Sequence, residues 1–257
     1  MTRTPRRARA LPVAVAALLG LVGPVGLVGP APAPALGAAS GVVAEWRMDE
    51  PAGSRVLVDA SSHGVDGVVG AAVRTGVAGG TPLLHRWSDV RPNQPPATPE
   101  RVTQVADGRL DPGTRDYAVV FRYRTTRPFG NILQKGQATT RGGQVKVQLP
   151  RGTESCLYTG ALGRRAVRSA GAYHDGQWHR VRCERTAAGV ALTVWDDPTG
   201  QDADLVLRER RTIRGATGLL DNAVPFTIGG KINCDQVEVT CDYFAGDIDW
   251  VRVEASA

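Results

Sequence analysis

Residues 226–253 read FTIGGKINCDQVEVTCDYFAGDIDWVRV. Two short apolar runs, FTIGG at its start and IDWVRV near its end, have the composition of β-strands and enclose a polar segment bounded by Cys234 and Cys241. A loop bounded by cysteines between two strands is typical of a secreted β-protein. The stretch therefore predicts that the chain ends in strands of a disulfide-containing β-domain.

The chain holds four cysteines, and all of them follow residue 39. An even number in an oxidising compartment favours two disulfides, for which three pairings exist. The simplest pairing joins Cys234 to Cys241 locally and leaves Cys156 with Cys183. A zinc site is the alternative, but the sequence has no C-x-x-C pair with ligand spacing.

Residues 1–39 have the order of a secretory signal peptide: four arginines, an apolar run over residues 11–28, and then small residues and prolines. Glycines and a proline interrupt the run, which makes a retained membrane span the poorer alternative. The pair Arg6-Arg7 matches twin-arginine export weakly. We expect residues 40–257 to form one secreted domain with no stable membrane span.

The formal net charge of +6 is largely due to this leader. Without its four arginines, 27 basic side chains face 25 acidic ones. The near balance removes the main support for nucleic-acid binding, so no nucleic-acid partner is expected. Only three of the basic residues are lysines, which points to a GC-rich bacterial genome.

The region after residue 40 consists of short alternating runs separated by turns. Residues 117–124 (YAVVFRYR) place Tyr117, Val119, Phe121 and Tyr123 on one face, as in a half-buried strand. Residues 179–185 and 190–194 form a predicted hairpin, in which His179 packs on the apolar face. Residues 71–106 are poorly periodic and predict loops with one or two strands. The other predicted strands are residues 131–135, 144–149, 155–158 and 205–213. About a dozen strands without an amphipathic helix predict an all-β, two-sheet antiparallel β-sandwich or jellyroll.

Three motifs resemble the laminin-G-like jellyroll domains of the concanavalin A-like lectin/glucanase superfamily. They are W-x-x-D-E at residues 46–50, D-G-x-W-H-x-V at residues 175–181, and G-D-I-D-W-V-R-V at residues 246–253. The resemblance covers residues 42–254 and implies a concanavalin A-like sandwich. It also implies that the first hairpin and the last strand can lie side by side. A structural calcium site would then join Asp59 or Asp66 to Asp247 or Asp249.

No catalytic signature is present, and we expect no enzyme activity. Hydrolases of this fold place their acids as E-x-D-x-E or E-x-D-x-x-E, and neither pattern occurs. The nearest groups of acids are Glu45 with Asp49 and Glu50, and Glu238 with Asp242. Their spacing differs from the hydrolase patterns, and we interpret them as acids of turns and loops. The sequence also lacks G-x-S-x-G and H-E-x-x-H.

Candidate ligand-binding residues are the aromatic side chains predicted near loops: Trp87, Tyr173 and Trp195. Flat rings can stack on the apolar faces of sugars. Core packing is expected for the other tryptophans, at positions 46, 178 and 250. Two arginine groups, at residues 164–165 and 208–211, could meet anionic glycans, although solvated strand faces are the simpler interpretation.

These observations favour a secreted, non-catalytic binding module for an extracellular glycan or a cell-surface protein. Two alternatives stay open, a polysaccharide-active enzyme with an unfamiliar acid pair and a structural protein of the cell envelope or matrix. The sequence does not decide the ligand or the oligomeric state.

Overall fold

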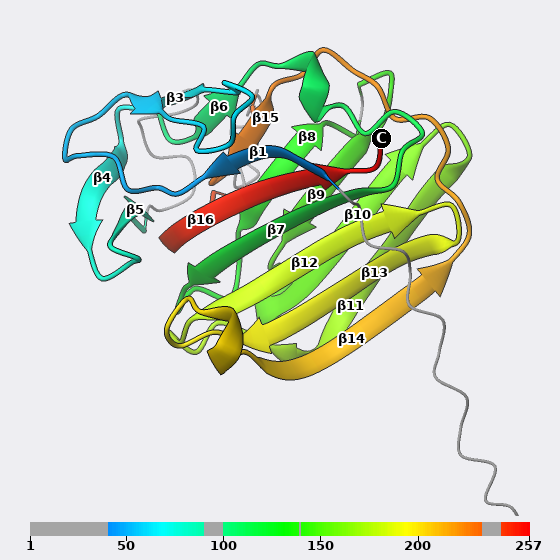
Figure 1. The fold of residues 1–257 in the computed structure, drawn as a ribbon. Helices are drawn as coiled ribbons and strands as arrows, with labels where there is room; N and C mark the ends of the chain where they lie inside the picture. Colours follow the sequence, from blue (N-terminus) through cyan, green and yellow to red (C-terminus); the bar gives the residue numbers. More distant parts are fainter. Residues whose placement is uncertain (1–40, 90–99, 139, 233–242) are drawn as a thin grey trace, which may run out of the picture. The chain divides into compact units, whose positions relative to one another are not determined.

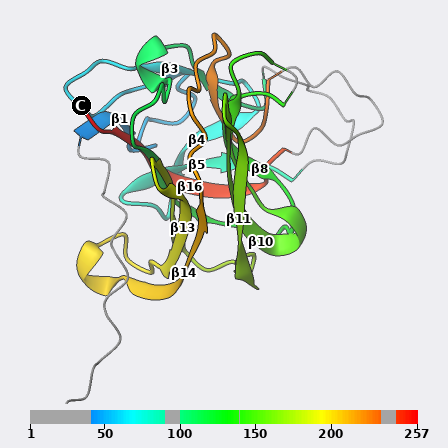
Figure 2. The same ribbon diagram turned by 90° about the vertical axis from the view of Figure 1, so that its right-hand side faces the viewer.

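The computed structural model describes residues 41–89, 100–138, 140–232 and 243–257, which form a β-sandwich of two antiparallel sheets (Figures 1 and 2). The first sheet has eight strands, and β1 (Gly41–Trp46) joins its seven-strand path by pairing with β16. In order, that path is β14 (Val206–Arg214), β13 (Gly189–Asp196), β12 (His179–Thr186), β7 (Tyr117–Arg124), β16 (Gly246–Ala255), β5 (Leu83–Trp87) and β4 (Val73–Ala78).

The second sheet lies behind the first in Figure 1 and also has eight strands. In order, they are β11 (Gly163–Ala172), β10 (Thr153–Gly160), β9 (Gln144–Gln148), β8 (Asn131–Gly136), β15 (Phe226–Ile228), β6 (Thr103–Val105), β3 (Gly67–Val69) and β2 (Val56–Leu57). Three short 3₁₀ helices complete the described elements: η1 (Gly108–Leu110), η2 (Pro150–Gly152) and η3 (Asp202–Asp204).

The core between the sheets is built from alternating side chains, as the sequence predicts. On β7, Tyr117, Val119, Phe121 and Tyr123 all belong to the buried core. On β12, Val181 and Cys183 do the same, and His179 is buried beside them. A period of two places every second residue of such a strand in the core, so the intervening arginines point to the outer face. The all-β sandwich is confirmed.

The largest difference from the sequence-based expectation is β11, a ten-residue strand that was not predicted. Its sequence, GRRAVRSAGA, is rich in Arg, Ala and Gly and contains one β-branched residue, so it lacks a strand pattern. Pairing with β10 along most of its length holds it in the sheet. The poorly periodic region at residues 71–106 contains three strands, β4, β5 and β6, and not the one or two that were predicted.

A disulfide joins Cys156 of β10 to Cys183 of β12 and so links the two sheets across the core. This confirms one of the predicted pairs. The other pair, Cys234 with Cys241, lies outside the described residues. So do the predicted signal peptide at residues 1–39 and the proline-rich loop at residues 91–99.

Removing the bridge should destabilise the sandwich markedly. The cysteines are 27 residues apart, and closing a loop of that length restricts the unfolded chain by about 3.5 kcal/mol in the chain-entropy model. The variant Cys156→Ala/Cys183→Ala should lose about that much unfolding free energy in a urea titration. A loss below about 1 kcal/mol would contradict the assignment of this bridge as a main stabilising link.

Candidate functional site

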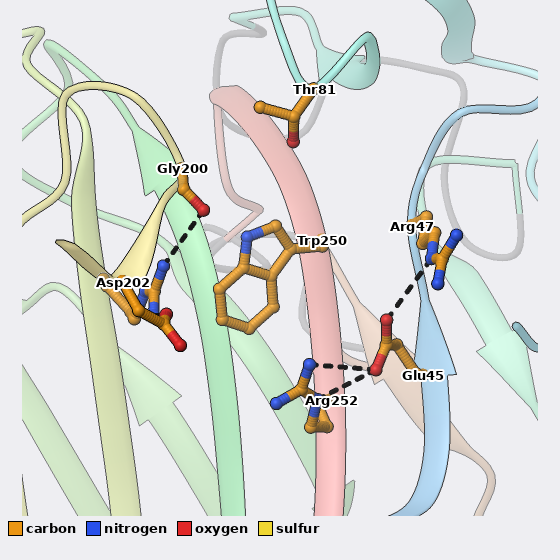
Figure 3. Close-up of a pocket in the computed structure, with 8 residues that line it drawn as sticks. Glu45, Arg47, Thr81, Gly200, Asp202, Trp250 and Arg252 are labelled. Atoms are coloured by element: carbon orange, nitrogen blue, oxygen red, sulfur yellow. Dashed lines mark hydrogen bonds and ion pairs between the residues drawn. The ribbon is translucent and has the colours of Figure 1, made fainter. Parts of the chain in front are cut away.

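The best-defined candidate site is a pocket around Trp250 on the outer face of the first sheet (Figure 3). Its cavity volume is about 280 Å³, slightly below the roughly 300 Å³ at which most ligand pockets begin. Eight residues line it: Glu45, Arg47, Thr81, Arg180, Gly200, Asp202, Trp250 and Arg252.

Trp250 reaches this face because β16 alternates. Val251, Val253 and Ala255 point into the core, whereas Trp250 and Arg252 share the opposite phase and point outward. The chain bulges between residues 248 and 250, where the register with β7 shifts. The indole thus lies on the outer sheet face, where half-buried rings can meet a ligand.

The rim of the pocket comes from elements that are distant in sequence. Glu45 lies on β1 directly opposite Arg252, and Arg47 follows at the end of that strand. Thr81 belongs to the β4–β5 turn. Gly200 and Asp202 belong to the connection between β13 and β14, which forms the wall seen on the left in Figure 3.

Charged groups surround the indole, and the guanidinium groups are paired with carboxylates. The guanidinium carbons of Arg180 and Arg252 lie 5.0 and 5.7 Å from the ring centroid, within cation–π range. Glu45 accepts from Arg252 at 3.0 Å and from Arg47 at 3.3 Å. Asp202 accepts from Arg180, and this bond lowers the pKa of Asp202. The lining combines one flat apolar surface with three guanidinium groups and two carboxylates.

A buried ionic network beneath the pocket fixes its walls. Arg122, 2% exposed, donates to the Asp249 carboxylate at 2.8 Å and to the backbone carbonyl of Asp197 at 2.9 and 3.0 Å. Asp249 also accepts from the backbone and hydroxyl of Thr81, at 2.6 and 2.7 Å. The Asp197 carboxylate accepts from Arg180 at 2.8 Å. One side of the network therefore holds the β4–β5 turn and the other holds the β13–β14 connection.

The aromatic residues predicted to bind ligand lie in different environments. Trp87 belongs to β5 and is 4% exposed, and Tyr173 is 6% exposed beneath a hollow of about 390 Å³. Both rings are packed against other rings, Trp87 against Phe244 at 6.1 Å and Tyr173 edge-on against His179 at 5.1 Å between ring centroids. Trp195 is half-buried on β13, not in a loop. Both tryptophans lie near loops as predicted, because Trp87 is the last residue of β5 and Trp195 is the last but one of β13.

Core packing is confirmed for Trp46, which is fully buried, but it was wrong for Trp178 and Trp250. Trp178 packs against Arg122 and Arg124, whose guanidinium carbons lie 4.1 and 4.6 Å from its ring centroid. The sequence did contain a signal for Trp250. In WVRVEA it shares its phase with Arg252, not with the valines.

The calcium site implied by the resemblance is not supported by the contacts of its four aspartates. Asp247 pairs with Arg86 at 2.6 Å and with Arg124 at 2.8 Å. Asp249 is bound by Arg122 and Thr81 as described above. Both carboxylates are thus already neutralised by protein donors and do not fit a calcium ion.

The other two aspartates organise the first hairpin. Asp59 accepts backbone N–H bonds from Glu45, Ser61 and Val65 at 2.8–2.9 Å. Burial alone would raise the pKa of Asp59, but the combined effect of these hydrogen bonds is larger and lowers the pKa below its ordinary value. Asp66 accepts from the backbone of Asp59. Among the described residues, no group of three or more His, Cys, Asp or Glu side chains could hold a metal.

Two of the acids weighed for glycoside hydrolysis, Glu45 and Glu50, are also engaged, whereas Asp49 is exposed. Glu50 lies in the loop after β1, as predicted, but it is buried 2.7 Å from the His85 ring and accepts from the backbone of Val58. Glu45 is paired with two arginines, as described. Glu238 and Asp242 lie outside the described residues.

Comparison with known protein families identifies the fold group. A family model described as the laminin G domain matches residues 123–256, more than half of the chain. This chain belongs to the laminin G domain family. No curated protein sequence matches it.

Solved structures give this laminin G domain further relatives in fold. Domain 4 of AbnA, an extracellular arabinanase of Geobacillus stearothermophilus solved with arabinotriose, aligns with a TM-score of 0.57 and 14% identity over 86% of this chain and 96% of that one. The binding domain of botulinum neurotoxin serotype D aligns at 0.53 and 10%, over 84% and 48%.

The LG1-3 region of the laminin alpha2 chain aligns with a TM-score of 0.46 and 18% identity over 60% of this chain. The laminin G domain described here spans only 29% of that structure. Within the described residues, no helix has the length and apolar character needed to cross a membrane.

Proposed function

We propose that this laminin G domain is a secreted, non-catalytic module that binds a carbohydrate in the Trp250 pocket. The observation that carries the proposal is the outward indole of Trp250, surrounded by guanidinium, carboxylate and backbone carbonyl groups. A sugar ring has an apolar C–H face and a polar edge. Such a ligand would stack on the indole and bond to the groups around it.

The pairing of the pocket charges favours a neutral sugar, because each of the three arginines in the lining is bound to a carboxylate and buried Asp197 also binds Arg180. Arg180 and Arg252 are each tied to a carboxylate, and Arg47 shares the carboxylate of Glu45. These groups still have free donor and acceptor positions. Asp202 has 89% of its side chain exposed, and Arg47 has 60%. Hydroxyl groups, which both donate and accept, match this mixture. The cavity volume suits one sugar unit, with the rest of the chain outside.

The fold neighbour from the arabinanase supports a carbohydrate ligand, because its structure was solved with arabinotriose. The similarity is one of fold alone, and the ligand of this domain has to be identified by experiment. Export is supported by the leader sequence and by the Cys156–Cys183 bridge, since disulfides persist in oxidising compartments.

A binding role is favoured over catalysis by the state of the pocket carboxylates. General acid catalysis at neutral pH requires a carboxyl group with a raised pKa. Asp202 has a lowered pKa because Arg180 binds it, and Glu45 is held between Arg47 and Arg252. Neither carboxylate is thus placed as a proton donor.

The test is a glycan array that includes arabinotriose, followed by titration of the best neutral ligand. Trp250→Ala should weaken binding about 30-fold, since truncating a central aromatic anchor typically costs about 2 kcal/mol. Trp195→Ala is the matched control, because Trp195 is a half-buried tryptophan outside the lining of this pocket. It should bind like the unchanged protein.

Three results would contradict the proposal. One is the absence of any glycan ligand, which would favour the structural or protein-binding alternative. Another is equal loss of affinity in the two tryptophan variants. The third is hydrolysis of a bound glycan that is abolished by a single carboxylate substitution, which would show an enzyme.

A further inference from the structure

Seven arginines form a basic edge on one side of the sandwich. Arg164, Arg165 and Arg168 lie on β11, and Arg208, Arg210, Arg211 and Arg214 lie on β14. These are the outermost strands of the two sheets. The basic edge contains both arginine groups that the sequence singles out, and none of its residues lines the Trp250 pocket.

The two strands lie side by side, as Figure 1 shows at the lower right. Glu209 of β14 joins them by accepting backbone N–H bonds from Ala170 and Gly171 of β11, at 2.9 and 3.1 Å. Strands of nine and ten residues rise about 3.3 Å per residue and so extend for about 30 Å. The basic edge is therefore a long, continuous strip.

Few carboxylates compensate this strip. Arg208 pairs with Asp196 at 3.4 Å, Arg210 with Glu184 at 2.9 Å, and Arg211 with Glu209 at 3.7 Å. In the described part of the chain, no ion pair involves the remaining four arginines of the edge. Glu209 is the single acidic residue on either strand, and it is already bonded to β11. The strip carries a net positive charge.

The uniform sign of the charges requires an explanation beyond protection of the sheet edges. Charged residues on edge strands prevent pairing with other chains, and either sign serves that purpose. Outside the leader, the chain has nearly as many acidic as basic residues. A strip with seven bases and one acid departs strongly from that balance, and its field attracts anions.

We propose that the basic edge binds a linear anionic polysaccharide at a second site, separate from the Trp250 pocket. Arginine is suited to this partner because its planar guanidinium donates two parallel hydrogen bonds to a carboxylate. A nucleic acid fits less well. Neither β11 nor β14 contains an aromatic residue on which bases could stack. A polymer with repeated acid groups would engage several arginines along the strip.

The experiment uses polygalacturonate as the probe, with neutral dextran and single-stranded DNA as comparisons. Polygalacturonate should bind, and its affinity should fall steeply with added salt. Binding releases counterions from the polymer, and their release becomes less favourable as the salt concentration rises. Arg164→Gln/Arg168→Gln and Arg211→Gln/Arg214→Gln should each weaken binding about tenfold, because two exposed ion pairs contribute about 1.4 kcal/mol together.

The matched control is Arg55→Gln/Arg74→Gln, which removes two exposed arginines at the opposite edges of the sheets, before β2 and on β4. It should leave polygalacturonate binding unchanged. Trp250→Ala should also leave it unchanged, so failure of the neutral-sugar proposal and failure of this one give different results. Equal loss in the control, equal binding of dextran, or tighter binding of DNA would each overturn the inference.

Discussion

Replacing Asp249 with alanine is expected to lower the free energy of unfolding by about 3 kcal/mol. The reason is Arg122, which is 2% exposed and would keep its charge with a single carboxylate nearby, that of Asp197 at 3.6 Å. The backbone and hydroxyl of Thr81 would also lose their acceptor. Urea unfolding followed by circular dichroism measures the loss.

Two further variants separate the effect of an unpaired buried charge from the effect of removing any carboxylate of β16. Asp247→Ala removes a nearby carboxylate of the same strand, but its partners Arg86 and Arg124 are 36% and 31% exposed. Water can solvate them afterwards, so the loss should be about 1 kcal/mol. The double variant Arg122→Met/Asp249→Leu should recover part of the stability lost in Asp249→Ala. Equal losses for Asp247→Ala and Asp249→Ala would contradict this account.

The second large effect concerns Glu154 and depends on pH. Glu154 lies on β10 and is fully buried in the sandwich. The nearby hydroxyl of Tyr123 donates to the carbonyl of Tyr173 at 2.9 Å, and no well-formed hydrogen bond to either carboxylate oxygen of Glu154 is seen among the described residues. Burial raises the pKa of Glu154 to about 8, and the neighbouring Tyr123 hydroxyl offsets part of the rise.

The sign of the effect follows from comparing the folded and unfolded chains. In the unfolded chain the carboxyl group ionises near its ordinary pKa of 4.5. Between that value and about 8, the unfolded form has lost the proton that the folded form keeps, so rising pH favours unfolding. The glutamate therefore costs roughly 3–5 kcal/mol at pH 8 and almost nothing below pH 4.5.

Glu154→Gln should remove this dependence. The variant should be more stable than the unchanged protein at pH 8, and the difference should shrink toward pH 4.5. Glu209→Gln provides a control of opposite sign. Burial raises the pKa of Glu209, but hydrogen bonds from Ala170, Tyr173 and Gly171 lower it more. Its contribution is therefore lost as the pH falls. A constant stability difference for Glu154→Gln from pH 5 to 8 would refute the prediction.

The fold could be predicted from the sequence where side chains alternate between the core and the outer face of a sheet, although β7 is buried on both faces and not half-buried as its pattern suggests. YAVVFRYR and HRVRCER alternate clearly because their sheet separates core from outer face, and both strands were placed within one residue. The strand β11 could not be predicted, because it is the outermost strand of its sheet and buries few residues. Its sequence therefore shows no alternation of apolar and polar residues. The sequence pattern within β11 does not indicate that this segment pairs with β10.

The candidate site was harder to predict because its parts meet only in three dimensions. The phase of Trp250 against Val251 and Val253 indicates the outer face, but its rim depends on contacts across the sheet. The β13–β14 connection reaches the pocket through Arg122 and Arg180, which belong to other strands. The sequence around residue 200 has no pattern from which those contacts could be predicted.

The way in which this connection is held has a consequence for how the domain can evolve. Arg122 and Arg180 bind the backbone carbonyls of Asp197, Pro198 and Gly200, and Arg180 also binds the carboxylates of Asp197 and Asp202. Among residues 198–205, the side chains that make none of these contacts are free to change without moving the wall of the pocket. Under the proposed sugar-binding role, substitutions there would alter ligand preference while the sandwich and its ionic support stay constant.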